Sequence, residues 1–378
     1  MFHQEFVAVE HATPVTGYDV VVCGACGAGY ADGIPAQEAF DRYYRDMSNY
    51  EYAQRGGEES EFDRRRLTLV AGLVAQHLPA VDVRVLDVGC ASGRLLAALR
   101  DLGYGRVTGL DPSPASATAA QRLYGIEVRT MTLGAIAAAG NHFDVVILVG
   151  VLEHLRDLDV SCGHLHALLP THGLLYLEVP DVTSFADWPN AAYQEFSTEH
   201  INFFSPASLD NLMRRHGFSR VFLEQNHREQ SYRTTMSNVS AVYRREDVPL
   251  GPIRFNTDTV TGLERYLARS AADEQRLLEQ IDALVDSQRR LLVWGVGTHT
   301  RRLLASSRLA DANIVAFLES NRGYHGKALV GRPILAPEAL RDYSEPVLIS
   351  SRVFEKEIAD QIRLGLRCTN ELILLYHV

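Results

Sequence analysis

The chain has 378 residues, which is long enough for two or three domains and excludes a single small module. Its formal net charge is −10 at pH 7, so no global basic field is present to attract nucleic acid or anionic lipid. The N-terminus lacks the basic start and apolar core of a secretory signal, and no apolar run approaches the roughly 18 residues of a membrane span. We therefore expect a cytoplasmic protein with no nucleic-acid and no membrane partner.

The first 35 residues are rich in turn formers and contain one pair at metal-ligand spacing, Cys23 and Cys26. One such pair supplies half of a tetrahedral zinc site, and His3 and His11 are candidates for the other half. A turn without metal is an equally good interpretation. The remaining cysteines are scattered, which argues against a disulfide framework and fits a reducing compartment.

Two side-chain patterns follow one another between residues 37 and 78. An aromatic stripe at mixed helical spacing predicts packing more than a substrate cage, and it consists of Phe40, Tyr43, Tyr44, Met47, Tyr50 and Tyr52. One apolar helical face is then predicted by the spacing of Leu67, Val70, Leu73, Val74 and Leu78.

A small-residue turn, Gly89-Cys90-Ala91-Ser92-Gly93, follows an apolar strand predicted at 83–88. A helix begins after the turn, and the strand predicted at 106–110 ends at Asp111. This spacing is typical of an acid that binds the ribose of a nucleoside cofactor. The turn therefore predicts a nucleoside ligand that contacts the backbone.

Details of the turn decide which nucleoside is expected. A dinucleotide fingerprint requires glycine at its third and sixth positions, where this chain has Ala91 and Arg94. Asp87 precedes the first glycine by two residues, where its charge would repel a pyrophosphate but can hold an ammonium group. The turn thus favours a cofactor with an amino-acid tail over a dinucleotide, and it argues against a dehydrogenase.

Strand and helix patterns alternate through the middle of the chain. Such alternation predicts an α/β fold with a mainly parallel sheet, helices on both faces and ligands at its carboxyl edge. The predicted strands lie near 83–88, 106–110, 126–130, 143–149 and 173–179.

Taken together, these residues resemble the class I S-adenosylmethionine-dependent methyltransferases. The resemblance covers roughly residues 60–225 and rests on Asp87-x-Gly89-x-x-x-Gly93, Asp111, and the strand at Phe143-Asp144-Val145-Val146 that leads to Val151-Leu152-Glu153-His154-Leu155. It implies a Rossmann-like, seven-stranded core whose final antiparallel strands lie near 218–225 and 237–244. It also implies that the aromatic segment forms a lid over the cofactor.

The resemblance assigns roles to the cofactor-binding residues. It places the methionine part on Gly89, Cys90, Ala91 and Gly93 with Asp87, the ribose on Asp111 next to Pro112, the adenine edge on Met131 and Thr132, and the sulfonium beside Val149 and Gly150. Glu153 and His154 would shape the same pocket.

A polar stretch after the fifth strand resembles a motif of the sugar C-methyltransferases. In that family a Glu-His pair lies at the acceptor sugar, and Glu199 and His200 match it, with His200 as the base and the acid orienting it. Ser197 and Phe203 replace the two tyrosines of the motif, so two phenol groups are missing. The same family often begins with a zinc module of two Cys-x-x-Cys pairs, of which only the second is present here. The alternative reading of Glu199 and His200 is a pair preceding a helix capped by Ser205.

The chain ends in a second α/β pattern. A turn-rich stretch at 249–256 is followed by one long helix or two consecutive helices up to about residue 289. A strand, a glycine turn at Gly295-x-Gly297 and a helix then open a smaller Rossmann-like domain, in which we expect the turn to be structural. The predicted domains are a knuckle and lid segment (1–57), a methyltransferase domain (58–248), a helical connector (249–289) and the C-terminal domain (290–378).

We predict an S-adenosylmethionine-dependent methyltransferase acting on a small molecule, either a nucleotide-linked (deoxy)sugar or a natural-product intermediate, as a monomer or homodimer. Transfer to oxygen or nitrogen of a secondary metabolite stays open, as does a non-catalytic cofactor-binding scaffold. Zinc at Cys23 and Cys26 is a further possibility.

Overall fold

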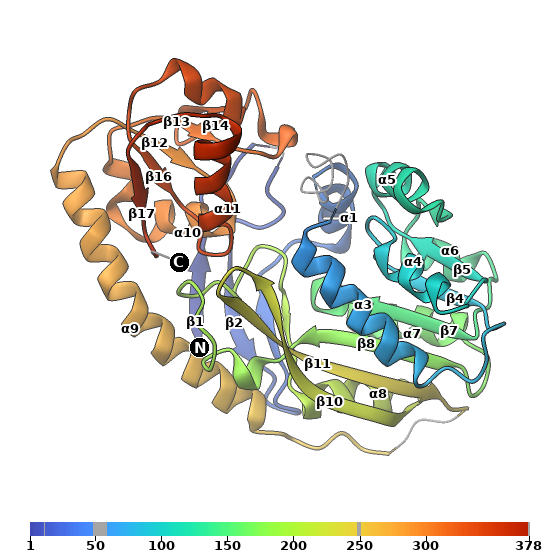
Figure 1. Ribbon diagram of the computed structural model, residues 1–378. Coiled ribbons are helices and arrows are strands. Elements are labelled where there is room, and N and C mark those ends of the chain that lie inside the picture. The colour runs from blue at the N-terminus through green and yellow to red at the C-terminus, as the bar shows by residue number, and fades with distance from the viewer. Residues whose placement is uncertain (11, 48–58, 248–250, 377–378) are drawn as a thin grey trace.

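The computed structural model describes residues 1–10, 12–47, 59–247 and 251–376, and the chain forms three β-sheets with their covering helices (Figure 1). His11, Tyr50 and Tyr52, which the sequence analysis singled out, lie outside the described residues. No helix of the described part is long and apolar enough to cross a membrane.

The central sheet has seven strands in the order β10-β11-β8-β7-β4-β5-β6. The strands from β8 to β6 run parallel, whereas β11 pairs antiparallel with both β8 and β10. This arrangement confirms the predicted mostly parallel sheet with antiparallel final strands. The strands are β4 (Val85–Val88), β5 (Val107–Leu110), β6 (Val128–Arg129), β7 (Val145–Val149), β8 (Leu174–Pro180), β10 (Phe218–Ser231) and β11 (Thr234–Arg245).

Both faces of this sheet are covered, because its inner strands are apolar at successive positions. Leu86 and Val146 belong to one buried cluster and Val85 and Val145 to another, as expected when alternate side chains leave a strand on opposite faces. The helices of this part are α3 (Glu61–Ala75), α4 (Arg94–Asp101), α5 (Pro114–Tyr124), α6 (Leu133–Ala138), α7 (Leu158–Leu168) and α8 (Pro206–Arg215). The predicted cap of α8 is present, since Ser205 and Ser208 form a capping box.

The N-terminal residues form three strands of a four-stranded sheet, and the fourth strand comes from the central part of the chain. Its order is β1-β2-β3-β9. The strands are β1 (Phe2–Glu5), β2 (Gly17–Val22), β3 (Gly29–Asp32) and β9 (Asn202–Phe203), and α1 (Gln37–Asp46) follows β3. Because β9 directly follows His200, this sheet positions part of the candidate site.

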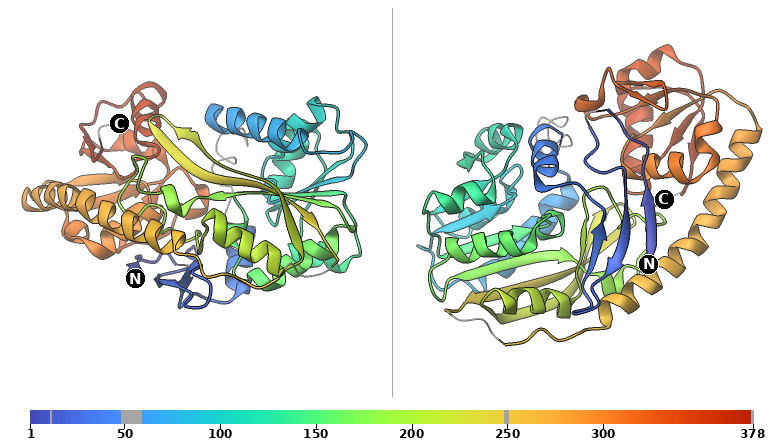
Figure 2. Two further views of the ribbon diagram at one scale, coloured as in Figure 1. Left: turned by 90° about the horizontal axis from the view of Figure 1, so that it is seen from below. Right: turned by 180° about the vertical axis from the view of Figure 1, so that it is seen from behind.

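The C-terminal domain has a six-stranded sheet and is reached through one helix of 29 residues, α9 (Asp258–Asp286). This helix runs along the outer edge of the molecule between the two larger bodies (Figure 2). The sheet order is β14-β15-β13-β12-β16-β17, parallel except for β14. The elements are β12 (Leu291–Trp294), α10 (Thr298–Ser306), β13 (Ile314–Leu318), β14 (Ala328–Leu329), β15 (Arg332–Leu335), β16 (Val347–Ile349), α11 (Glu355–Asp360) and β17 (Leu372–Leu374).

Short helical turns complete the described chain. They are η1 (Leu152–His154), η2 (Val182–Ser184), η3 (Arg308–Asp311), η4 (Arg322–Tyr324), η5 (Pro337–Asp342) and the π-helical η6 (Gln361–Gly365).

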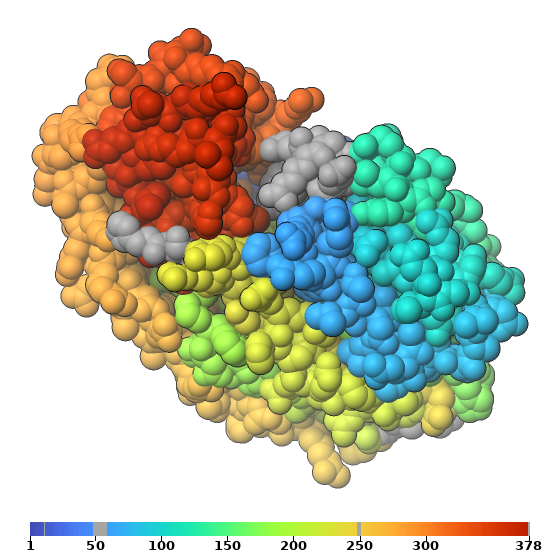
Figure 3. Space-filling model, viewed as in Figure 1, coloured from blue at the N-terminus to red at the C-terminus, as the bar shows by residue number. Residues whose placement is uncertain are grey.

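Several contacts join the C-terminal domain to the rest, and two of them lie at Arg301 and at the tip of the β10–β11 hairpin. Arg301 of α10 is buried, and its Nε donates to the carbonyl oxygen of Val7 at 2.9 Å, while the amide of Val7 donates back to the carbonyl of Arg301. At the tip of the β10–β11 hairpin, Nζ of Lys356 in the C-terminal domain lies 5.8 Å from the ring centroid of Tyr232. The surface view shows the hairpin next to that domain (Figure 3). The buried guanidinium keeps its charge compensated by backbone carbonyls, so the domain orientation depends on the N-terminal strand.

The packing of α9 predicts the effect of a single added methyl group. A Cβ on Gly262 would lie 2.5 Å from the carbonyl oxygen of Val182, so Gly262→Ala should destabilise the protein by roughly 1–3 kcal/mol in urea unfolding. Gly163 of α7 is the matched control, because it is exposed and a Cβ there meets nothing within 4 Å. Gly163→Ala should stabilise the protein by about 0.5–1 kcal/mol, and equal effects of the two changes would contradict this packing.

Burial of His299 in α10 predicts a pH dependence of stability. Desolvation, and then the charge of Arg302, lower its pKa from 6.5 to about 3. Below pH 6.5 the unfolded chain takes up a proton that the folded protein does not, so stability is complete above pH 6.5 and falls towards pH 3. The slope from one such group approaches about 1.4 kcal/mol per pH unit. His299→Gln should reduce the slope of stability against pH in urea unfolding, and an unchanged slope would contradict this origin.

Candidate active site

A cavity of about 330 Å³ lies at the carboxyl edge of the central sheet. Its walls come from the turn after β4, the end of β7, the end of β8, helix α3 and the β10–β11 hairpin. The lining residues used below are Arg66, Asp87, Gly89, Cys90, Ala91, Val149, Gly150, Glu153, His154, Glu178, His200, Arg228 and Asn238. Ligands of open parallel sheets bind at this edge, so the cavity is the candidate active site.

The turn after β4 exposes backbone to the cavity because its conformation excludes larger side chains. Gly89 has φ +72°, and a Cβ there would lie 2.5 Å from the side chain of Val151. The amide of Gly89 donates to the carbonyl of Leu110 at the end of β5. Gly93 has φ +78° and immediately precedes α4. The turn is thus held between two strand ends, and its glycines are required by both backbone conformation and space.

Two buried carboxylates lie beside this turn. The pKa of Asp87 is raised well above its usual value by desolvation and then by the nearby charge of Asp111. The carboxylate of Asp111 accepts from the backbone amides of Ala91 at 3.1 Å and Ser113 at 2.9 Å. A cation bound at Asp87 would therefore be favourable, because it would relieve the repulsion between the two acids.

The cavity lining contains only one half of the predicted cofactor residues. Asp87, Gly89, Cys90, Ala91, Val149 and Gly150 line it, whereas Gly93, Asp111, Pro112, Met131 and Thr132 are not part of its lining. Asp111 reaches the wall through its hydrogen bond to Ala91. Met131 and Thr132 are exposed beside the end of β6, where Thr132 caps α6. The roles predicted for the adenosine end stay predictions.

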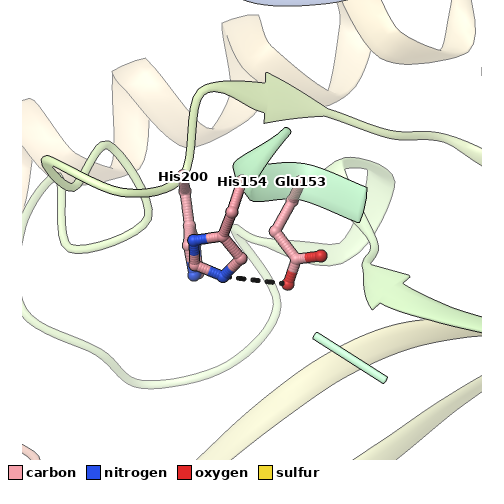
Figure 4. Close-up of side chains that lie close together, drawn as sticks. All are labelled: Glu153, His154 and His200. Carbon is pink, nitrogen blue, oxygen red and sulfur yellow. Dashed lines mark ion pairs between the residues drawn. The ribbon is translucent and has the colours of Figure 1, made fainter. Parts of the chain in front are cut away.

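Glu153, His154 and His200 line the cavity and lie close together (Figure 4). The two histidines are 46 residues apart in the sequence, which gave no indication of this contact. The amide of Ile201 donates to the carbonyl of Glu153 at 3.0 Å, and the side-chain amide of Asn202 donates to the carbonyl of Leu155 at 2.9 Å. These bonds fasten the segment before β9 onto η1. The two histidine rings lie edge to face with centroids 5.0 Å apart.

Burial changes the protonation of these groups. Desolvation raises the pKa of Glu153 to about 8 and lowers the pKa of His200 to about 4. Desolvation followed by the charge of His200 lowers the pKa of His154 well below 6.5. At neutral pH both rings are therefore neutral and present nitrogen lone pairs.

The structure gives Glu199 and His200 different partners. The carboxylate of Glu199 accepts from the phenol of Tyr43 at 2.9 Å and is not part of the cavity lining. Glu195 is the acid beside His200, with its Oε2 3.9 Å from Nδ1 of the ring. The expectation that Glu199 orients His200 is therefore corrected, because the turn capped by Ser197 directs the two adjacent side chains apart.

Helix α1 supplies phenols that the motif itself lacks. Tyr43 contacts Glu199, and the Oη of Tyr44 lies 2.9 Å from Nδ1 of His154. Phe40, Tyr43 and Met47 are buried, so most of the described aromatic stripe packs, as the spacing favoured. Tyr44 in addition reaches the site.

Several polar residues of the cavity were missed by sequence reasoning. Glu178 is buried in β8, where it accepts from Ser240 and faces Arg66 at 3.4 Å and Arg228 at 3.6 Å. A glutamate inside the apolar run Leu174–Pro180 was a detectable signal. Asn238 and Arg228 come from the hairpin and carried no local signal.

Cys23 and Cys26 form the turn between β2 and β3. Hydrogen bonds to the backbone amides of Ala25 and Cys26 lower the pKa of the Cys23 thiol, which favours a thiolate. His3 pairs with Asp19 instead of joining them. Within the described ranges, Glu153, His154 and His200 are the one group of three or more potential ligands with close ligand atoms. Zinc at the cysteine pair stays a prediction.

Comparisons with known proteins agree with this architecture. A family model described as a methyltransferase domain matches residues 53–221, and a second, described as C2185-like, N-terminal, matches residues 287–371. A ubiquinone biosynthesis O-methyltransferase from Cereibacter sphaeroides is 30% identical over 175 residues, which cover 43% of this chain and 67% of the relative.

The chain belongs to the class I S-adenosylmethionine-dependent methyltransferases. Membership in this enzyme family argues against the non-catalytic scaffold. A relative of the same name from Methylobacterium nodulans is 33% identical over 128 residues, covering 30% of this chain and 51% of the relative. The methyltransferase thus spans about half the length of this curated relative.

Two solved structures resemble it at low sequence identity. Magnesium protoporphyrin IX methyltransferase from Synechocystis with bound S-adenosylhomocysteine has 20% identity and a TM-score of 0.41, covering 55% of this chain and 98% of the other. The 1,6-didemethyltoxoflavin-N1-methyltransferase of Burkholderia thailandensis has 19% identity and a TM-score of 0.43, covering 64% and 100%.

The residues that line the cavity are chemically suited to S-adenosylmethionine, the cofactor of the family. The glycine turn lets a ligand approach the backbone closely, and the buried carboxyl group of Asp87 suits the positively charged amino-acid tail of S-adenosylmethionine.

Proposed function

We propose that this methyltransferase methylates a small, hydroxyl-bearing metabolite, either a nucleotide-linked (deoxy)sugar or a natural-product intermediate. One observation carries the proposal: His200 and the Gly89 turn line the same cavity. The acceptor side of that cavity is polar, with Glu178, Arg228 and Asn238 in its wall. Such side chains can pair with the hydroxyl groups of a sugar or polyol.

When bound, S-adenosylmethionine supplies an electrophilic methyl group on a sulfonium. The protein must then align the acceptor and exclude water, because methyl transfer is an in-line displacement. Asp87 and the Gly89 turn bind the methyl donor, and His200 presents a neutral ring to the acceptor. Glu199 supports the acceptor side indirectly, through Tyr43 of α1.

A second candidate is O-methylation of a secondary metabolite that is not a sugar. The names of the two sequence relatives, both ubiquinone biosynthesis O-methyltransferases, favour it. Donor labelled in its methyl group would separate the candidates, since the product of each acceptor class can be isolated and the labelled atom located. Label on a nucleotide-linked sugar, whether on carbon or on oxygen, supports the sugar candidate, and label on the phenolic or enolic oxygen of another metabolite supports the second.

Substitutions at the two ends of the cavity should have different effects. Asp111→Ala should weaken donor binding at least about tenfold in calorimetry, because it removes the acceptor of the Ala91 amide and a ribose ligand. His200→Ala should leave donor affinity within about threefold and lower methyl transfer about 100-fold or more. An equal loss of donor affinity in both variants would contradict this division.

A further inference from the structure

The meeting of Glu153, His154 and His200 has the composition of a metal site. Each residue offers one ligand atom, and these atoms all lie within 4.8 Å of one another. Glu153 and His154 come from η1 and His200 from the segment before β9, and the close-up shows them facing one another (Figure 4). Two imidazoles and one carboxylate form a set that leaves coordination positions open.

The distances within the cluster suit coordination better than hydrogen bonding. Oε1 of Glu153 and Nε2 of His154 are 3.6 Å apart, which is long for a hydrogen bond. Two ligands on a tetrahedral ion with bonds of about 2.1 Å are separated by about 3.4 Å. A cation between these atoms would therefore require little rearrangement.

An unpartnered buried atom points to a missing ligand. The side chain of Glu153 is 3% exposed, and its Oε2 has no hydrogen-bond partner among the described residues. A buried carboxyl oxygen without a partner is costly, so something normally satisfies it. A cation at the cluster would do so.

An outer contact orients the ring of His154 for coordination, whereas the carboxylate near the ring of His200 lies beyond direct hydrogen-bond distance. Tyr44 lies 2.9 Å from Nδ1 of His154, and Glu195 faces Nδ1 of His200 at 3.9 Å. A contact on Nδ1 leaves Nε2 of the same ring available, and histidines that bind metals usually have such an outer partner.

We propose that Glu153, His154 and His200 bind one divalent transition-metal ion whose open positions face the cavity and take a hydroxyl oxygen of the acceptor. Imidazole ligands favour Zn²⁺, Mn²⁺, Fe²⁺ or Co²⁺ over Mg²⁺ or Ca²⁺. This inference rests on the proposed function, because it places the ion at the acceptor end of the methyltransferase cavity. It assigns the lone pair of His200 to the metal, in place of direct proton removal.

The ion would act as a Lewis acid on the acceptor. It would acidify the bound hydroxyl, whose proton leaves to water. The oxygen lone pair then forms the bond to the methyl carbon, and the carbon–sulfur bond breaks with its electron pair remaining on sulfur. The products are a methyl ether, a neutral thioether and one released proton.

The test uses the full chain with Cys23→Ser and Cys26→Ser, which removes the other candidate metal site. After treatment with a chelator and its removal, the protein is titrated with Co²⁺ and Zn²⁺. We expect one equivalent of metal per chain and a visible Co²⁺ spectrum without thiolate charge transfer. Absence of stoichiometric binding would overturn the proposal.

Matched variants locate the ion. Glu153→Gln and His200→Gln should each weaken Co²⁺ binding by more than tenfold, and Tyr44→Phe should weaken it about tenfold through His154. Tyr43→Phe is the control, because the neighbouring phenol contacts Glu199 instead. Binding that is unchanged in both Glu153→Gln and His200→Gln overturns the assignment. Thermal unfolding identifies a variant that does not fold. The variants that do fold then decide whether the ion binds at this cluster.

Donor binding separates failure of this inference from failure of the proposed function. Asp111→Ala should lose affinity for S-adenosylmethionine and keep the metal. If donor binding and methyl transfer survive in chelator-treated protein that binds no Co²⁺, the metal site is wrong and the proposed function stands. If metal binds but no hydroxylated metabolite accepts the methyl group, the proposed function fails.

Discussion

The attachment of β9 to η1 is the constraint on which the acceptor half of the cavity depends. The amide of Ile201 and the side chain of Asn202 bind the carbonyls of Glu153 and Leu155. β9 pairs at the same time with β3 of the N-terminal sheet. A single short segment therefore joins the central sheet to the N-terminal sheet and carries His200 into the cavity. Because its polar groups are backbone atoms or an amide, the geometry is directional and tolerates little displacement.

Two buried acidic side chains contribute to the electrostatics of the cavity. Asp87 and Glu153 are buried carboxyl groups that line the same cavity, and desolvation raises the pKa values of both. Keeping acids in a poorly solvated wall is costly unless a cationic ligand compensates them. The ammonium group of the donor at Asp87 and a metal ion at Glu153 would supply that compensation.

The C-terminal domain acts on the site through the N-terminal part of the chain. Arg301 binds the carbonyl of Val7, and Met47 and Tyr43 of the α1 region belong to the same buried cluster as Val293 and Phe317. Helix α1 carries Tyr43 and Tyr44 to Glu199 and His154. The second Rossmann-like domain therefore contributes to the site by fixing the helix that supplies these phenols.

The sequence by itself determined the methyltransferase core. Its signals are local: apolar strands, the Gly89 turn and the acid at the end of the second strand. A buried parallel strand requires a run of apolar residues, and a turn with positive φ favours glycine, so both can be recognised from neighbouring residues in the sequence. The helix cap at Ser205 could be predicted from the sequence for the same reason. Only the tertiary structure decided that His200 meets Glu153 and His154, that Glu195 faces His200 in place of Glu199, and that α1 provides the phenols. The contacts of His200 with His154 and of Tyr43 with Glu199 join residues 46 and 156 positions apart. Their formation depends on how strands pair and domains pack, which no local pattern encodes.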